Sequence, residues 1–165
     1  MARWSFKVAK FTPVAVADTT NFTDNGYMGL KGGHSLHVIR IHEIYIGELA
    51  AYSSPTIMLF SRDSTVHVTP TALAAGQSNA STDPGEPAPN APAVAFTAST
   101  TKPQRSATLG LLNLSFNAFG GKVKWQSDEA IEMLGNVASF GEVSLSAYTG
   151  GTPGAIGAHI IYEPE

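Results

Sequence analysis

The sequence TLGLLNLSFNAF, residues 108–119, decides the fold class of this chain. Within it, Leu112, Leu114 and Phe116 alternate with polar residues. Because successive side chains of a β-strand point to opposite faces, this alternation predicts a strand with one face in a core and the other in solvent. It is the cleanest half-buried strand pattern in the chain.

Working outward from this strand, the glycine pair at residues 120–121 predicts a hairpin turn into a second strand at residues 122–126. Residues 128–134 favour a further strand, although their Asp-Glu-Ala start also suits a single helical turn. More strands are expected at residues 4–17, 27–30, 35–49, 56–68, 142–149 and 155–162. With no helix signal between them, these strands predict an all-β fold, a single antiparallel β-sandwich of jelly-roll-like type.

The longest of these strands has apolar residues on both faces. Ile39 and Ile41 share one parity, whereas Ile44 and Ile46 share the other. Two explanations are open. Either the strand is central and covered on both sides, or a bulge near residues 40–42 switches its parity.

Residues 69–107 interrupt the strand pattern. This segment is rich in proline, alanine and threonine, contains six prolines, and has charges that cancel. So long a connection without strand signals is uncommon in a compact domain unless it has a function. Neither flank has enough strands to close a sandwich alone. Residues 1–165 are therefore predicted to form one domain, with residues 69–107 as an extended loop or arm inserted within it and ordered by a partner surface.

Composition narrows the range of functions. Charged residues make up 14% of the chain, against about 25% in typical soluble proteins. Low charge suits a subunit whose surface meets other subunits, and equally a neutral, turn-rich β domain. The net charge of −3 gives no general attraction to nucleic acid, and the absence of cysteine excludes disulfides and thiolate sites. The N-terminus lacks the apolar run of a signal peptide, and no run reaches the ~18 apolar residues of a membrane span.

The candidate chemical groups form no recognised catalytic motif. The strand spacing of His34, His37 and His42 does not direct them to one point, as the metal site of a cupin-like enzyme would require. Neither a nucleophile-elbow serine nor a phosphate-binding glycine loop is present. We therefore predict no enzyme and no catalytic, cofactor-binding or metal-binding residues. The carboxylates of the second half are interpreted as solvated loop groups: Asp128, Glu129, Glu132 and Glu142.

Several strand-and-turn motifs resemble small virion-associated proteins of bacteriophage and prophage origin. They are FNAFGG at residues 116–121 followed by Trp125, LGN at 134–136, GEVSLS at 141–146, GAHIIYEP at 157–164, IHEIY at 41–45 and SRDST at 61–65. The resemblance covers the greater part of the chain outside residues 69–107. It implies a phage structural protein and no particular site.

The sequence therefore predicts a viral, phage-type virion structural protein, namely a self-assembling coat or capsid-decoration subunit. Its expected partners are copies of itself, another capsid protein, or both, with no membrane and no strong nucleic-acid binding. Its expected location is the virion, after synthesis in the host cytoplasm. The predicted subunit contacts lie on the N-terminal strand and the arm, at Trp4, Phe6, Pro84, Pro87, Pro89, Pro92 and Phe96.

Two alternatives are open. A fibre knob, or another carbohydrate- or receptor-binding module, would bind glycans through loops such as residues 150–154. A cupin-like enzyme ranks last, because its metal ligands would have to converge at about 2 Å from one ion.

Overall fold

The computed structural model describes residues 2–71, 80–83, 85, 94–135, 139–148 and 153–164. Within this part all regular structure is β, and no helix is long and apolar enough to cross a membrane. The strands are β1 (Trp4–Phe11), β2 (Tyr27–Lys31), β3 (Val38–Glu48), β4 (Pro55–Thr65), β5 (Val68–Pro70), β6 (Ala80–Ser81), β7 (Val94–Phe96), β8 (Ser99–Thr101), β9 (Gln104–Asn117), β10 (Lys122–Leu134), β11 (Glu142–Ala147) and β12 (Ile156–Pro164).

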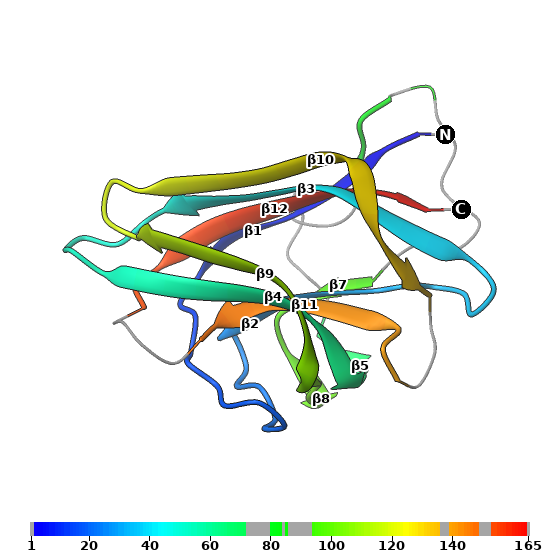
Figure 1. Ribbon diagram of the computed structural model, residues 1–165, viewed down its shortest axis with the longest axis horizontal. Helices are drawn as coiled ribbons and strands as arrows, with labels where there is room; N and C mark the ends of the chain where they lie inside the picture. The colour runs from blue at the N-terminus through cyan, green and yellow to red at the C-terminus, as the bar shows by residue number, and fades with distance from the viewer. Residues whose placement is uncertain are drawn as a thin grey trace.

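Two five-stranded antiparallel sheets form a sandwich (Figure 1). Sheet A has the strand order β10-β3-β12-β1-β6, and sheet B has the order β7-β2-β11-β4-β9. A small third sheet pairs β5 with β8 below sheet B in Figure 1. Each large sheet contains strands from both sides of the 69–107 segment. The all-β sandwich that the sequence predicts is thus confirmed.

Apolar side chains from both sheets form one buried core. Phe6, Ile44 and Ile160 of sheet A belong to the same cluster as Met58 and Leu145 of sheet B, and each is at most 1% exposed. Burying a side chain of this size stabilises the fold by about 1.5–3 kcal/mol. The inner faces of the sheets therefore supply the main stabilisation of the sandwich.

A bulge at His42 explains the mixed pattern of β3. Ile41 pairs with Tyr162 of β12 and Glu43 pairs with Ile161, so His42 has no partner in this register. The extra residue switches the parity of the strand, and isoleucines therefore face the core on both sides of it. Of the two explanations open from the sequence, the bulge is confirmed.

The turn at residues 118–121 does not form the predicted hairpin. β9 pairs with β4 in sheet B and β10 pairs with β3 in sheet A, so this turn crosses between the sheets. The β3–β4 loop crosses at the same corner, where Ala50 N donates a hydrogen bond to Ala118 O. A Cβ at Gly121 would lie 2.0 Å from Asn117 O, so the turn requires glycine there. A glycine turn serves a hairpin or a crossing equally well, and its sequence does not tell them apart.

The 69–107 segment is not one extended loop. Its described parts include β6, which pairs with β1 at the edge of sheet A, and β7, which pairs with β2 at the edge of sheet B. β8 pairs with β5, and β9 already begins at Gln104. Strand edges carry unpaired N–H and C=O groups, and this segment supplies partners for them. These parts are therefore ordered against the sheets of their own chain, which corrects the expectation of a partner surface.

A second layer covers the outer face of sheet B. Residues 12–26 and the β5–β8 pair contact this face, and β11 in its middle is buried at all six positions. A small apolar cluster joins this layer to sheet B, with Val16 and Phe22 from the layer and Tyr27 from β2. Because of this cover, the polar side chains of β11 are in the interior of the protein.

Candidate functional site

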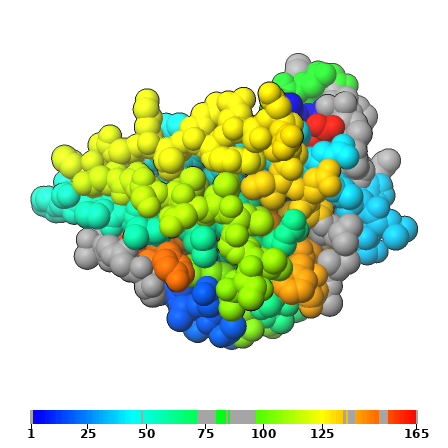
Figure 2. All heavy atoms as spheres, in the orientation of Figure 1, coloured from blue at the N-terminus to red at the C-terminus, as the bar shows by residue number. Residues whose placement is uncertain are grey.

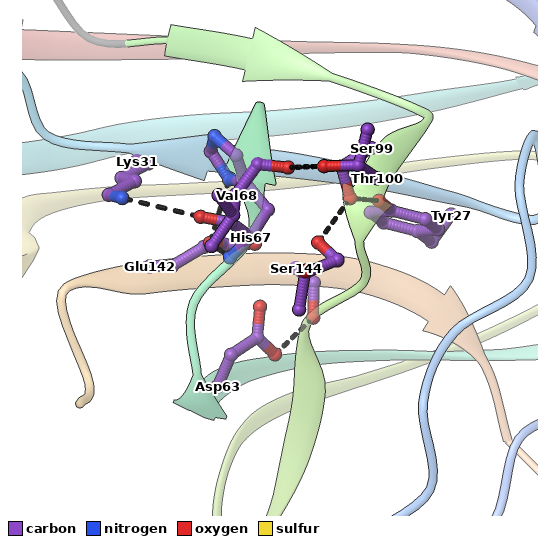
Figure 3. Close-up of polar contacts among 10 residues, drawn as sticks. Tyr27, Lys31, Asp63, His67, Val68, Ser99, Thr100, Glu142 and Ser144 are labelled. Atoms are coloured by element: carbon purple, nitrogen blue, oxygen red, sulfur yellow. Dashed lines mark hydrogen bonds and ion pairs between the residues drawn. The ribbon is translucent and has the colours of Figure 1, made fainter. Parts of the chain in front are cut away.

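The candidate site is a buried cluster of polar side chains on the outer face of sheet B (Figure 3). β11 contributes Glu142 and Ser144, and the neighbouring β4 contributes Asp63; all three are 0% exposed. Val143 pairs with Arg62 in the register of these strands, so the adjacent residues Glu142 and Asp63 lie opposite each other. Side chains in such a cross-strand pair have Cβ atoms about 4.5–5.5 Å apart, which brings the two carboxyl groups together.

The two carboxyl groups share an environment without water contact. Ser144 Oγ donates to Asp63 Oδ1 at 2.6 Å, whereas Asp63 Oδ2 and Glu142 Oε1 are buried without an assigned hydrogen-bond partner in the described part. Burial, and then the neighbouring Glu142 carboxylate, raise the pKa of Asp63 well above its usual range. A proton on Asp63 removes the repulsion between its charge and the Glu142 carboxylate.

Glu142 also fastens the start of β5 to sheet B. Its Oε2 accepts a hydrogen bond from the backbone N–H of His67 at 2.8 Å and lies 2.9 Å from the ring Nδ1 of the same residue. Lys31 Nζ donates to His67 O at 3.4 Å from the other side (Figure 3). His67 is only 3% exposed, and it forms one wall of a shallow hollow of about 330 Å³ between Lys31 and Pro70.

Arg105 forms the second half of the cluster and joins three segments of the chain. This side chain is fully buried, and it donates to Val16 O at 2.9 Å, to Ala147 O at 2.9 Å and to Ser146 Oγ at 2.5 Å. Asp18 is its ion-pair partner at 3.7 Å. Burial lowers the pKa of Arg105, and the Asp18 carboxylate opposes that shift. The guanidinium thus connects residues 12–26, β9 and β11.

The chemistry of this cluster is fastening and proton binding. Hydrogen bonds to charged groups contribute about 1.5–3 kcal/mol each, roughly twice as much as neutral ones. The cluster therefore holds the covering layer on sheet B, and the raised pKa of Asp63 favours a proton on this side chain within the folded protein.

A second polar group lies on the outer face of sheet A. Glu43 Oε2 accepts from Lys124 Nζ at 2.8 Å, and Glu43 Oε1 lies 2.9 Å from His159 Nε2. Partial burial opposes ionisation of Glu43, but the hydrogen bonds from Lys124 and His159 outweigh it and lower the pKa of Glu43. The Tyr45 ring stacks on His159 with centroids 5.1 Å apart.

The residues predicted for subunit contacts are not brought together. Phe6 is 0% exposed and belongs to the core of its own chain, where its side chain has no surface to offer a neighbouring subunit. Trp4 is half-buried and packs against the same core. Phe96 is in β7, opposite Gly29 of β2, and its side chain lies outside the described part. The four predicted proline contacts also lie outside the described residues: Pro84, Pro87, Pro89 and Pro92.

The histidines and carboxylates also differ from their sequence interpretation. His42 Nε2 lies 3.3 Å from Glu163 Oε2, His67 contacts Glu142, and His159 contacts Glu43. Each of these three histidines therefore contacts a different carboxylate. Among the described residues, no group of three or more histidine or acidic side chains could hold a metal ion. The interpretation of Glu142 as a solvated loop carboxylate is wrong, because the covering layer buries it completely.

Sequence reasoning also missed Asp63, Arg105 and the two serines of β11 as members of one cluster. Their only common signal was polar residues within strand patterns. Comparisons of the chain with protein-family models, with curated proteins and with solved structures found no match.

Proposed function

We propose that the chain is a virion structural subunit of bacteriophage type, a coat or capsid-decoration protein built on a jelly roll. The strand order carries this proposal. Without the short β5–β8, eight long strands remain, in the orders β10-β3-β12-β1 and β2-β11-β4-β9. Six connections cross between the two sheets, namely β1–β2, β2–β3, β3–β4, β9–β10, β10–β11 and β11–β12. Two four-stranded antiparallel sheets with this alternation support the proposal of a jelly roll, a fold of viral capsid proteins, lectins and cupins.

Fold does not by itself imply function, so the surface has to distinguish these classes. Apolar side chains fill the space between the sheets, which is the region where a cupin would hold its metal. A filled interior favours a rigid building block. Such a block acts through contacts on its outside, and the resemblance to phage virion proteins in the sequence agrees with that role.

Exposed apolar side chains at one corner of the sandwich support an assembly role. Tyr52 is 83% exposed, Phe119 54% and Leu49 49%. They lie on the β3–β4 and β9–β10 crossings, which are joined by the Ala50–Ala118 hydrogen bond. We call Leu49, Tyr52 and Phe119 the corner patch. Exposed apolar side chains that lie close together are typical of contact surfaces, whereas single ones are common on any protein.

Tyr52→Asp is expected to reduce the yield of ordered particles in negative-stain electron microscopy by roughly tenfold or more, because it would place a charge in a contact that buries an aromatic ring. Gln126→Asp is the matched control, since Gln126 is an exposed polar residue of β10. Equal particle yields for both variants would contradict the use of the corner patch.

Immunogold labelling of virions from the producing host tests the virion role itself, and unlabelled particles would contradict it.

A glycan-binding module is the second candidate, favoured by a hollow of about 300 Å³ on the outer face of sheet A. Tyr45 and His159 line it beside Gly47 and Gly157, which are paired across β3 and β12 and leave space next to the tyrosine ring. An aromatic ring with adjacent polar groups suits a sugar. Saturable binding on a glycan array that Tyr45→Ala abolishes would favour this function over the coat role.

A further inference from the structure

We propose that the chain pairs with a second copy of itself through the free edge of β9, extending sheet B across a two-fold axis at Asn113. This inference rests on the proposed assembly function and deepens it by naming one interface and its partner.

The four edges of the two large sheets in the described structure differ in how they resist pairing. β6 has two residues and β7 has three, so both are too short to guide another strand. β10 is long, but it carries Lys122, Lys124 and Glu132, and its register with β3 is irregular between Gln126 and Ile131. Short length, charges and bulges are the devices by which proteins prevent edge-to-edge association.

β9 has none of these devices from Leu112 to Asn117, and its register shifts against β4 all lie before Leu112. Residues 106–121 contain no charged side chain, and β9 pairs with β4 without a register shift from Asn117 to Leu112. Its first residues are covered, because Gln104 bridges to Asn21 and Thr19 N donates to Arg105 O. Beyond them the strand runs along the front of the molecule, where Figure 2 shows it uncovered beside β10. A regular, uncharged stretch of strand edge such as residues 112–117 is a template for another strand.

The sequence of this edge points to a second copy as the occupant. A charged peptide would find no complementary charge on residues 106–121, whereas two such edges meet without repulsion. Residues opposite each other in an antiparallel pair share a face, and faces alternate along the strand. A two-fold axis perpendicular to the sheet must therefore lie midway between the two copies of one residue. Asn113 is at the middle of the uncharged run. Its exposed side chain would face its own copy.

This register also matches a protruding side chain with a hollow. Phe119 follows directly after β9, and Ala107 lies near the start of the strand, so antiparallel pairing brings the Phe119 of one copy toward the end of β9 that holds Ala107 in the other. Phe119 is 54% exposed. Ala107 lines a hollow of about 300 Å³ together with Gly110 and Leu59. The aromatic ring would lose water contact at the edge of the extended sheet, which favours the dimer.

Sedimentation velocity of the purified full chain tests the pairing. Wild-type protein is expected to dimerise, and Asn113→Lys and Asn113→Asp are each expected to raise the dissociation constant roughly tenfold or more through like charges at the axis. An equimolar mixture of the two variants should restore pairing as a heterodimer. Gln126→Lys on β10 is the control and should behave as wild type. A monomeric wild type, or variants that dimerise equally well alone and mixed, would overturn the proposal.

Cysteine cross-linking tests the register, since the chain has no cysteine of its own. Asn113→Cys should form an intermolecular disulfide under mild oxidation, because directly opposite Cα atoms lie about 4.5–5.5 Å apart. Ser115→Cys is the matched control: it is exposed on the same edge, but its copy would lie about 13 Å away along the strand. Equal cross-linking of both variants would overturn the axis at Asn113.

These outcomes separate this inference from the assembly function. Particles that still form from Asn113→Lys protein would contradict the use of the β9 pairing in assembly and leave the virion role in place. Specific dimers without particle or virion association would support the pairing and contradict the virion role.

Discussion

Arg105→Met is expected to lower the free energy of unfolding by about 3–5 kcal/mol, the largest single effect we predict for this chain. The substitution removes the donor for the buried Val16 carbonyl and takes one of two donors from Ala147 O, which keeps the Val16 N–H. It also leaves Ser146 Oγ with one partner fewer. A buried acceptor without a hydrogen bond costs about 1–3 kcal/mol. The change should be measured by urea denaturation followed by circular dichroism.

Two further variants define the cause. Arg105→Lys keeps the charge but cannot reach three acceptors with one ammonium group, so its loss should be intermediate. Arg40→Met is the matched control, because the Arg40–Glu132 ion pair is on the surface and contributes at most about 1 kcal/mol. If the Arg105→Met and Arg40→Met losses are equal, Arg105 does not fasten the covering layer.

Asp63→Asn is expected to make the protein more stable than wild type at neutral and higher pH. The pKa of Asp63 is raised in the folded state, so the folded chain holds this proton more tightly than the unfolded chain does. The stabilisation from that proton is complete below the unfolded pKa of about 4 and is lost as pH rises through the folded pKa. Asparagine resembles the protonated side chain, because its oxygen can accept from Ser144 and its amide can donate toward Glu142.

The advantage of Asp63→Asn should therefore grow with pH, by about 1.4 kcal/mol for each pH unit between the unfolded and folded pKa values. Urea midpoints of both proteins from pH 4 to pH 9 measure it. Asp128→Asn is the control, since Asp128 is exposed and its replacement should not change the pH profile. Parallel profiles for wild type and Asp63→Asn would show that the pair does not hold a proton.

The strands could be predicted from the sequence with good accuracy, because alternation is local. Residues 108–119 fall largely within β9, and the parity switch in the third strand is the bulge at His42. The glycine turn after β9 was predicted together with the strands on either side of it. The sheet that each strand joins was not, since a turn does not specify where the next strand pairs. The segment at residues 69–107 was interpreted as a loop because its strands β6, β7 and β8 are only two or three residues long and give no alternation pattern. β6 and β7 gain their order from the edges they cover.

The candidate site was less accessible to sequence reasoning than the fold. Glu142 and His67 are 75 positions apart, and either alone looks like an ordinary polar residue at a strand end. Their meeting depends on β5 folding back over sheet B. The same holds for Arg105, whose acceptors come from a loop and from a different strand.

By itself, the sequence determined that this protein is built from strands, which apolar side chains face a core, and that one long strand lacks charge. These properties follow from the two-residue period of a β-strand and from composition, and neither depends on distant residues. Only the tertiary structure decided which strands pair, which polar residues are buried together, and that β9 lies at an open edge. Those properties depend on contacts between residues far apart in the chain, and a covering layer determines whether a polar side chain is solvated or held in the interior.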